Sequence, residues 1–265
     1  MQPESTGKHG DQSPLGQGRL SSQPERGISF NNAAAMVRRI VAERHERPSL
    51  VAELACEIGA EIIEGIRKPG EDLNTVDLSN RYQTSRTPIR EALMRLQEDG
   101  LVRRDGYRGT AVSRISADEA RELLDLRLKL ELAGCRNSAS KADTDLPAVL
   151  STITTEMEAA AIADEHCDVI ELDHDFHLAL FRAADLPVLE PVLSRCILHM
   201  HRLAFISGPR SRPLIVSARR HWEIVEALKT GDAETLRTAV RRHIETVWEG
   251  ELESRLARAA SVTAR

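Results

Sequence analysis

The clearest pattern of hydrophobic and polar positions lies between Ser85 and Gly100. Apolar residues recur there at the spacing of one helical face, at Ile89, Ala92, Leu93 and Leu96. Ser85 or Thr87 can cap the start of such a helix, and Pro88 suits its first turn, where a missing N–H does no harm. Gly100 can end it. The pattern therefore predicts a short, capped helix with one buried face.

Polar residues at the start of this helix lie away from its apolar face. They are Arg86, Thr87 and Arg90. A basic, hydroxyl-bearing tip suits the major groove of DNA, where arginine can read guanine and a helix start can face a phosphate. Between residues 81 and 108 there are seven arginines and four acidic residues, although the formal net charge of the chain is −5. A local basic face on an acidic protein favours DNA as a partner.

Two helical patterns precede this helix, and two extended runs follow it. Their residue ranges are 50–66, 73–82, 101–104 and 110–113. Three helices followed by a β-hairpin predict a winged helix-turn-helix domain, which we place at residues 47–115. Arg108 and Gly109 lie in the hairpin turn, from which Arg108 can contact a minor groove or the DNA backbone.

From Ser116 onward the apolar pattern is helical. A long helix starts at Asp118, and further helical stretches cover residues 146–163, 169–184, 186–205, 217–229 and 233–256. Around six helices of this length predict an all-α bundle over residues 116–258. Residues 1–46, rich in Gly, Ser, Gln and Pro, predict a disordered or partly helical tail, and residues 259–265 a short C-terminal tail. The predicted fold is thus mainly α.

Three helices of the bundle carry polar residues on faces that are otherwise apolar. These residues are Asp173, His177, His221 and His243. Asp173 and His177 are one helical turn apart and project from the same face. Burying a carboxylate and three imidazoles is costly unless something satisfies them, and a divalent metal would do so in one step. Hydrogen-bonded core histidines are the ordinary alternative, and the residues alone leave both interpretations open.

Further polar residues in the bundle have less certain roles by spacing alone. Arg127 falls on the inward face of its helix, where it could pair with Glu131 or face a bound ligand. His199 and His201 are two residues apart and cannot share a helix face, so at most one should lie near the cluster. His174 is expected to face solvent.

Composition narrows the picture slightly. The chain has 265 residues, enough for two domains, and its aromatic fraction of 3% favours helices over a β-sandwich. Its four cysteines lack paired spacing, which predicts buried reduced thiols rather than disulfides or a zinc ribbon. The absence of a membrane-spanning apolar run and of a signal-peptide core predicts a cytoplasmic protein.

The N-terminal motif resembles the GntR family of bacterial transcription regulators. The resemblance rests on the run SRTPIREAL from Ser85 to Leu93, and on Pro69-Gly70, Asp77-Leu78-Ser79, Gly100-Leu101-Val102 and Arg108-Gly109. It implies that DNA is contacted by Ser85, Arg86, Thr87, Arg90, Arg108 and Gly109. The chain departs from the family's common pattern at Gly106-Tyr107 in the wing, and at Val76, where some members carry a DNA-contacting arginine.

The C-terminal part resembles the FCD ligand-binding domain of the FadR-type branch of this family. Many members of that branch hold a metal with an Asp-x-x-Phe-His segment and two later histidines. The corresponding residues here are Asp173, Phe176, His177, His221 and His243. The resemblance implies a divalent metal cofactor, with zinc, nickel, manganese and iron all compatible, and it implies that Arg127 binds the carboxylate of a small effector. Asp185 stands where the family often has asparagine.

These features favour a transcription regulator that responds to a ligand. A homodimer would read a palindromic double-stranded operator, and an organic acid at the metal would change the spacing of its two winged helices. Repression relieved by ligand is the expected arrangement. A metalloenzyme is the main alternative, because a His/Asp metal with open positions could activate water, but no carboxylate is evidently placed as general base. A structural metal, or a sensor of the metal itself, is the third interpretation.

Overall fold

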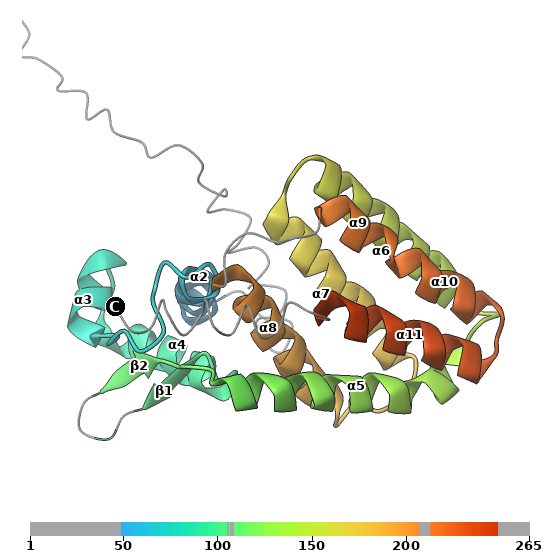
Figure 1. The fold of residues 1–265 in the computed structure, drawn as a ribbon. Helices are drawn as coiled ribbons and strands as arrows, with labels where there is room; N and C mark the ends of the chain where they lie inside the picture. The colour runs from blue at the N-terminus through green and yellow to red at the C-terminus, as the bar shows by residue number, and fades with distance from the viewer. Residues whose placement is uncertain (1–48, 105, 107–108, 207–212, 249–265) are drawn as a thin grey trace, which may run out of the picture.

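The computed structural model describes residues 49–104, 106, 109–206 and 213–248 (Figure 1). The predicted tails, the end of the last predicted helix and Arg108 lie outside these residues. The first folded unit consists of α2 (Leu50–Ile63), α3 (Thr75–Arg81), α4 (Arg86–Glu98), β1 (Val102–Arg104) and β2 (Thr110–Val112). This is the predicted winged helix-turn-helix, with the hairpin extending away from the helices.

Side chains and backbone pairing explain where the helices of this unit begin. Ser49 accepts a hydrogen bond from the N–H of Ala52 and caps α2. Ser85 occupies the N-cap position of α4, as predicted, although its side chain makes no capping hydrogen bond. The helix α3 begins two residues later than predicted, at Thr75. The reason is that Leu73 donates its N–H to the carbonyl oxygen of Thr110 at 2.7 Å. The segment around Leu73 thereby pairs with the hairpin as a third extended segment.

The predicted buried face of α4 is confirmed. Its four apolar residues are 0–4% exposed and join one core with residues of α2 and the wing, namely Ile89, Ala92, Leu93 and Leu96. Cys167, Ile170 and Leu198 belong to the same core, although they lie in helices of the C-terminal unit. The two units therefore share buried apolar surface.

The C-terminal unit is the predicted all-helical bundle. Its helices in the described part of the chain are α5 (Ala117–Ala139), α6 (Leu146–Ile162), α7 (His166–Arg182), α8 (Glu190–Ile206), α9 (Leu214–Arg219), α10 (His221–Lys229) and α11 (Ala233–Trp248). The predicted single helix over residues 217–229 is wrong, since α9 and α10 are separated at Arg220. The His221 ring binds the Ala218 carbonyl at 3.0 Å and competes for the backbone there.

The helix α8 lies between the two units, beside α2 on one side and α5 on the other (Figure 1). His199 contacts the carbonyl of Asp99, at the end of α4, at 3.0 Å. Arg202 is 0% exposed and donates to Oγ and the carbonyl oxygen of Ser113, at 2.9 and 2.6 Å. The helix α8 thus connects the bundle to the end of α4, the predicted recognition helix, and to the wing formed by β1 and β2.

Other expectations about the chain can be compared with the structure. All four cysteines are buried free thiols, as the sequence predicts. Among the helices of the described ranges, none is sufficiently long and apolar to cross a membrane.

Candidate functional site

The structure brings the four predicted metal ligands together. Asp173 and His177 project from α7, His221 from the start of α10, and His243 from α11, and one candidate ligand atom of each lies within 4.8 Å of the others. The three histidines are 0–4% exposed. Phe176, fully buried between them, packs its ring edge-on against His221 at a centroid distance of 4.7 Å. The predicted inward direction of these side chains is confirmed.

Hydrogen bonding determines which nitrogen of His177 faces the cluster. Nδ1 lies 2.6 Å from Glu131 Oε2, and the other oxygen of Glu131 accepts from Arg127 Nε at 2.7 Å. A carboxylate held by an arginine is an acceptor, so Nδ1 carries the proton and donates it. The lone pair of His177 is then on Nε2, which faces Asp173. A carboxylate behind a ligand histidine is the usual support of a metal site.

His221 is oriented in the same way by a backbone carbonyl. Its Nδ1 lies 3.0 Å from Ala218 O, and because a carbonyl can only accept, Nδ1 donates. The other ring nitrogen, Nε2, therefore faces Asp173 Oδ1 at 3.1 Å. Two acceptor atoms at this distance repel one another unless a cation or a proton lies between them. The interruption between α9 and α10 thus serves to aim this ring.

The inner atoms of the cluster have no hydrogen-bond partner of their own. His177 Nε2, His221 Nε2 and His243 Nδ1 are all buried and unsatisfied. Such groups are rare in proteins, because each forfeits its hydration without compensation. Three imidazole nitrogens and one carboxylate form a donor set suited to zinc, nickel, manganese or iron. The residues present therefore fit a divalent metal.

The charges of these groups also suit a cation. Burial, with the neighbouring His221 and His177, lowers the pKa of His243 well below its ordinary value, so this ring is neutral. Burial opposes ionisation of Asp173, but the neighbouring His201 and His221 lower the pKa of its carboxyl well below the usual range. Neutral imidazoles and an ionised carboxylate are the forms that coordinate a metal.

Arg127, the predicted effector ligand, lies beside this cluster. It is 5% exposed and pairs with Glu131, which was one of its two expected roles. Burial opposes its charge, yet Glu131 and Asp173 together raise its pKa. The pair with Glu131 uses Nε of the guanidinium.

Three further histidines of the bundle are buried, on α7 and α8. His201 Nε2 lies 3.2 Å from Asp173 Oδ2, whereas His199 points to Asp99, which agrees with the expectation that at most one of them is near the cluster. The expectation that His174 faces solvent is wrong. It is 1% exposed, and its Nε2 lies 3.1 Å from Ser194 Oγ, because α8 covers that face of α7. Only the packing of α8 reveals either contact.

A second candidate site lies at the start of α4. The residues predicted to contact DNA there are exposed, and they are Ser85, Arg86, Thr87 and Arg90. Within the described ranges, no carboxylate pairs with Arg86 or Arg90, whereas Arg67 and Arg81 both pair with Glu61. Gly109 is exposed with φ of 101°, which favours glycine. This surface presents uncompensated positive charge, as a DNA-binding face requires.

Two family models match the chain, one for each unit. The model described as bacterial regulatory proteins, gntR family, matches residues 50–112, and the FCD domain model matches residues 122–246. The boundaries of these matches fall within the two units of the fold.

Curated relatives and solved structures are similar over most of the chain. The HTH-type transcriptional repressor RspR of Escherichia coli is 27% identical over 71% of this chain and 83% of its own length. The transcriptional regulator YdhC of Bacillus subtilis is 28% identical over 69% and 82%. Among solved structures, E. coli McbR/YncC has a TM-score of 0.65 at 21% identity, covering 76% of this chain and 96% of its own. A GntR regulator from Rhodococcus sp. RHA1 has a TM-score of 0.64 at 22% identity, with 81% and 97% covered. Both solved structures support the fold described above for this chain, a winged helix-turn-helix followed by a helical bundle.

Proposed function

The chain belongs to the GntR family of bacterial regulators and carries an FCD domain, and on this premise we propose that a small organic acid bound at a metal in the FCD domain controls its affinity for an operator. The protein is a DNA-binding transcriptional regulator and not an enzyme, as are its relatives. The alternative of a metalloenzyme is therefore set aside.

The metal would be held by Asp173, His177, His221 and His243. The observation that carries this proposal is the convergence of two histidine lone pairs, fixed by Glu131 and Ala218, on an ionised carboxylate. When bound, the metal would supply open coordination positions for a carboxylate oxygen. The four side chains would hold the metal, and the buried Phe176 beside them would limit the access of water.

Arg127, which lies on α5, would help to bind the carboxylate of the effector. Its Nε is engaged by Glu131, but a guanidinium has five N–H donors, and the remaining ones could bind a carboxylate that also reaches the metal. Burial of Arg127 strengthens any such contact, since little water screens it.

The proposed regulator is a cytoplasmic homodimer that represses transcription until its effector binds. A palindromic operator has two half-sites, and a dimer presents two copies of α4 to read them. Arg86, Thr87 and Arg90 would contact base edges, with Ser85, Arg108 and Gly109 contacting the backbone or the minor groove. The effector would act by changing the separation of the two winged helices.

The test uses full-length protein freed of metal by a chelator and reloaded with zinc, nickel or manganese. Thermal unfolding is then followed against a panel of mono-, di- and tricarboxylic acids. We expect stabilisation by a subset of acids only in metal-loaded protein, and loss of this effect in His243→Ala. His166→Ala, which alters a partly exposed histidine at the start of α7 outside the cluster, should behave as wild type.

The outcomes distinguish the remaining interpretations of the metal. Stabilisation by metal with no effect of any acid, together with metal-dependent operator binding, would instead support a sensor of the metal itself. Stabilisation by metal with no change in operator binding would support a purely structural ion. Failure of wild type to bind any metal would exclude the proposed centre.

A further inference from the structure

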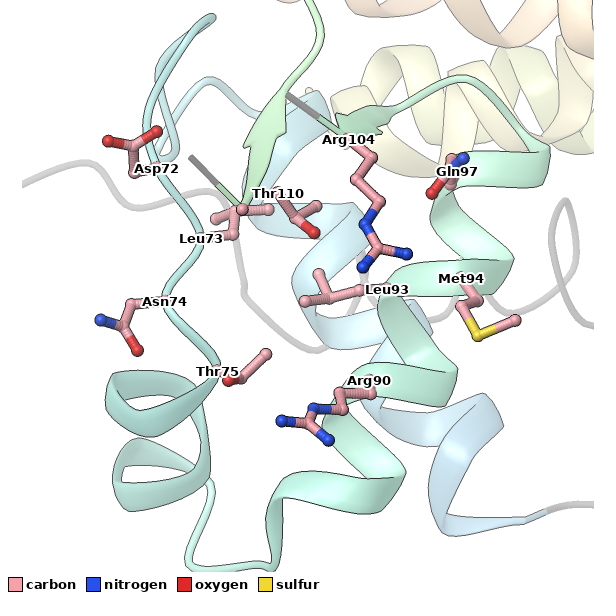
Figure 2. A pocket seen from close by; sticks show the side chains of 11 residues that line it. Asp72, Leu73, Asn74, Thr75, Arg90, Leu93, Met94, Gln97, Arg104 and Thr110 are labelled. Carbon is pink, nitrogen blue, oxygen red and sulfur yellow. The ribbon is translucent and has the colours of Figure 1, made fainter. Parts of the chain in front are cut away.

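A groove of about 520 Å³ lies between the recognition helix α4 and the wing, and most of its lining residues were not assigned to DNA contact from the sequence (Figure 2). Its walls come from three parts of the domain: the outer face of α4, the segment that precedes α3, and the strands β1 and β2. Arg90, Leu93 and Gly109 belong to the sequence motif, and the other lining residues were not singled out by it. The groove therefore needs its own explanation.

The charge of this groove is positive and uncompensated. Arg90 and Arg104 line it from α4 and from β1. Arg104 is exposed, and no described residue forms an ion pair with it. In Figure 2, Arg104 extends from the strand toward α4, and Arg90 extends from α4 toward the start of α3. The carboxylate of Asp72, which also lines the groove, points away from both guanidinium groups.

The neutral side chains of the groove are suited to an extended anionic strand. Thr75, Gln97 and Thr110 place hydroxyl and amide groups along its walls. Threonine and glutamine are common donors to DNA phosphates, alongside arginine and lysine. Met94, which is 62% exposed, adds apolar surface between them that a deoxyribose ring can cover.

The position of the groove indicates which part of DNA it meets. A recognition helix occupies the major groove, and a wing on the same face reaches the adjacent minor groove. One sugar–phosphate strand separates these two grooves in any duplex, so it must pass between the helix and the wing. The groove on the protein surface between α4 and β1 lies where this DNA strand would pass.

We infer that the groove between α4 and the wing seats one sugar–phosphate segment of the operator, and that Arg104 donates to a non-bridging phosphate oxygen there. This inference rests on the proposed function, since it needs a bound duplex. Arg104 thereby fixes the register of α4 in the major groove without reading a base. Its neighbour Arg103 lies on the opposite face of the strand, along a different surface, because successive strand residues alternate.

The test compares Arg104→Ala with Arg103→Ala in the full-length protein. A duplex selected from random DNA by wild type serves as operator, and a scrambled duplex of equal length serves as the non-specific control. We expect Arg104→Ala to weaken binding to both duplexes by a similar factor. The slope of log affinity against log salt should fall in magnitude by about 0.9, the contribution of one phosphate contact. Arg103→Ala should leave the slope unchanged.

A second measurement identifies the phosphate itself. Single neutral methylphosphonates are placed in turn along the operator strand that borders the recognised bases. At one position the substitution should weaken wild type but cause no further loss in Arg104→Ala, because the contact is already absent. Independent losses at every position, or an unchanged salt slope in Arg104→Ala, would overturn the inference. If wild type selects no duplex at all, the proposed function fails instead, which keeps the two failures distinct.

Discussion

Arg202 of α8 is bound by Ser113 at the end of the wing, through both the hydroxyl and the carbonyl oxygen of the serine. Ser113 Oγ in turn contacts the carbonyls of Gly100 and Leu101, at 2.5 and 3.0 Å. Burial lowers the pKa of Arg202 to about 10, so it stays charged near neutral pH, and no described carboxylate pairs with it. Ser113 thus binds the two terminal nitrogens of this guanidinium, while the buried Nε has no hydrogen-bond partner among the described residues.

We therefore expect Ser113→Ala to destabilise the whole protein. Removal of the hydroxyl leaves a donor of the buried guanidinium without its partner, which costs about 1–3 kcal/mol of unfolding free energy. Urea denaturation followed by far-UV circular dichroism measures it. Ser151→Ala, which removes a hydroxyl bonded within α6, should cost less than about 0.5 kcal/mol. Equal effects of the two substitutions would contradict the role given to Ser113.

Glu131→Gln should weaken metal binding although Glu131 is not a ligand. The carboxylate orients His177 and makes its ring a stronger donor, and loss of such a supporting group typically costs about 10–100-fold in metal affinity. Competition with a chromophoric chelator measures the change. Glu156→Gln, an exposed substitution on α6, provides the control. A metal affinity equal to that of wild type would show that Glu131 serves only to neutralise Arg127.

Arg90→Ala should reduce the discrimination between operator and random DNA. A bidentate arginine contact to guanine is worth about 1–3 kcal/mol of specificity. Fluorescence anisotropy with both duplexes at one salt concentration measures the ratio of affinities. Arg241→Ala, on the exposed face of α11, should change neither affinity. An unchanged ratio in Arg90→Ala would argue against this residue as a base contact.

Glu64 should make stability depend on pH at the junction of α2 and α7. Burial raises the pKa of its carboxyl to about 7, and the Cys167 thiol opposes this only partly. Between the unfolded value of 4.5 and 7, the native protein holds a proton that the unfolded chain has released. The stability contributed by this group therefore falls as pH rises through that window, and stays low above it.

Glu64→Gln removes the ionisable group while retaining the shape of the side chain. We expect the variant to be more stable than wild type at about pH 8, with a difference that shrinks toward about pH 5. Urea midpoints across this range test it. Glu53→Gln, exposed on the same helix, is the matched control for this substitution. The opposite trend in Glu64→Gln would mean that the carboxyl is ionised throughout.

Local patterns correctly predicted the buried face of α4 and the inward direction of the four clustered polar side chains in the bundle. The stripe from Ile89 to Leu96 and the one-turn spacing of Asp173 and His177 depend only on helical periodicity, which a sequence displays directly. Burial of His174 depends on where α8 lies, and no periodicity within α7 encodes that position. For the same reason the third backbone segment at Leu73 could not be foreseen, since its partner is 37 residues away in the chain.

The separation of α9 from α10 illustrates a different limit. Residues 217–229 have an uninterrupted helical pattern, and the break comes from one ring–carbonyl contact of His221. A hydrogen bond from a side chain to the backbone is comparable in strength to the backbone bond that it replaces. The spacing of hydrophobic residues carries no information about this competition for the Ala218 carbonyl.

Ile170 lies one turn before Asp173 on α7 and packs into the core beneath the recognition helix. The single helix α7 therefore carries one of the proposed metal ligands and also contributes to the core on which α4 packs. Two domains joined only by a flexible linker would rotate freely, and a structural change in the bundle would not reach the winged helix. A displacement of α7 at the cluster would therefore bear on the core that supports α4, so the proposed dimer would answer its ligand by altering its span across DNA rather than by melting.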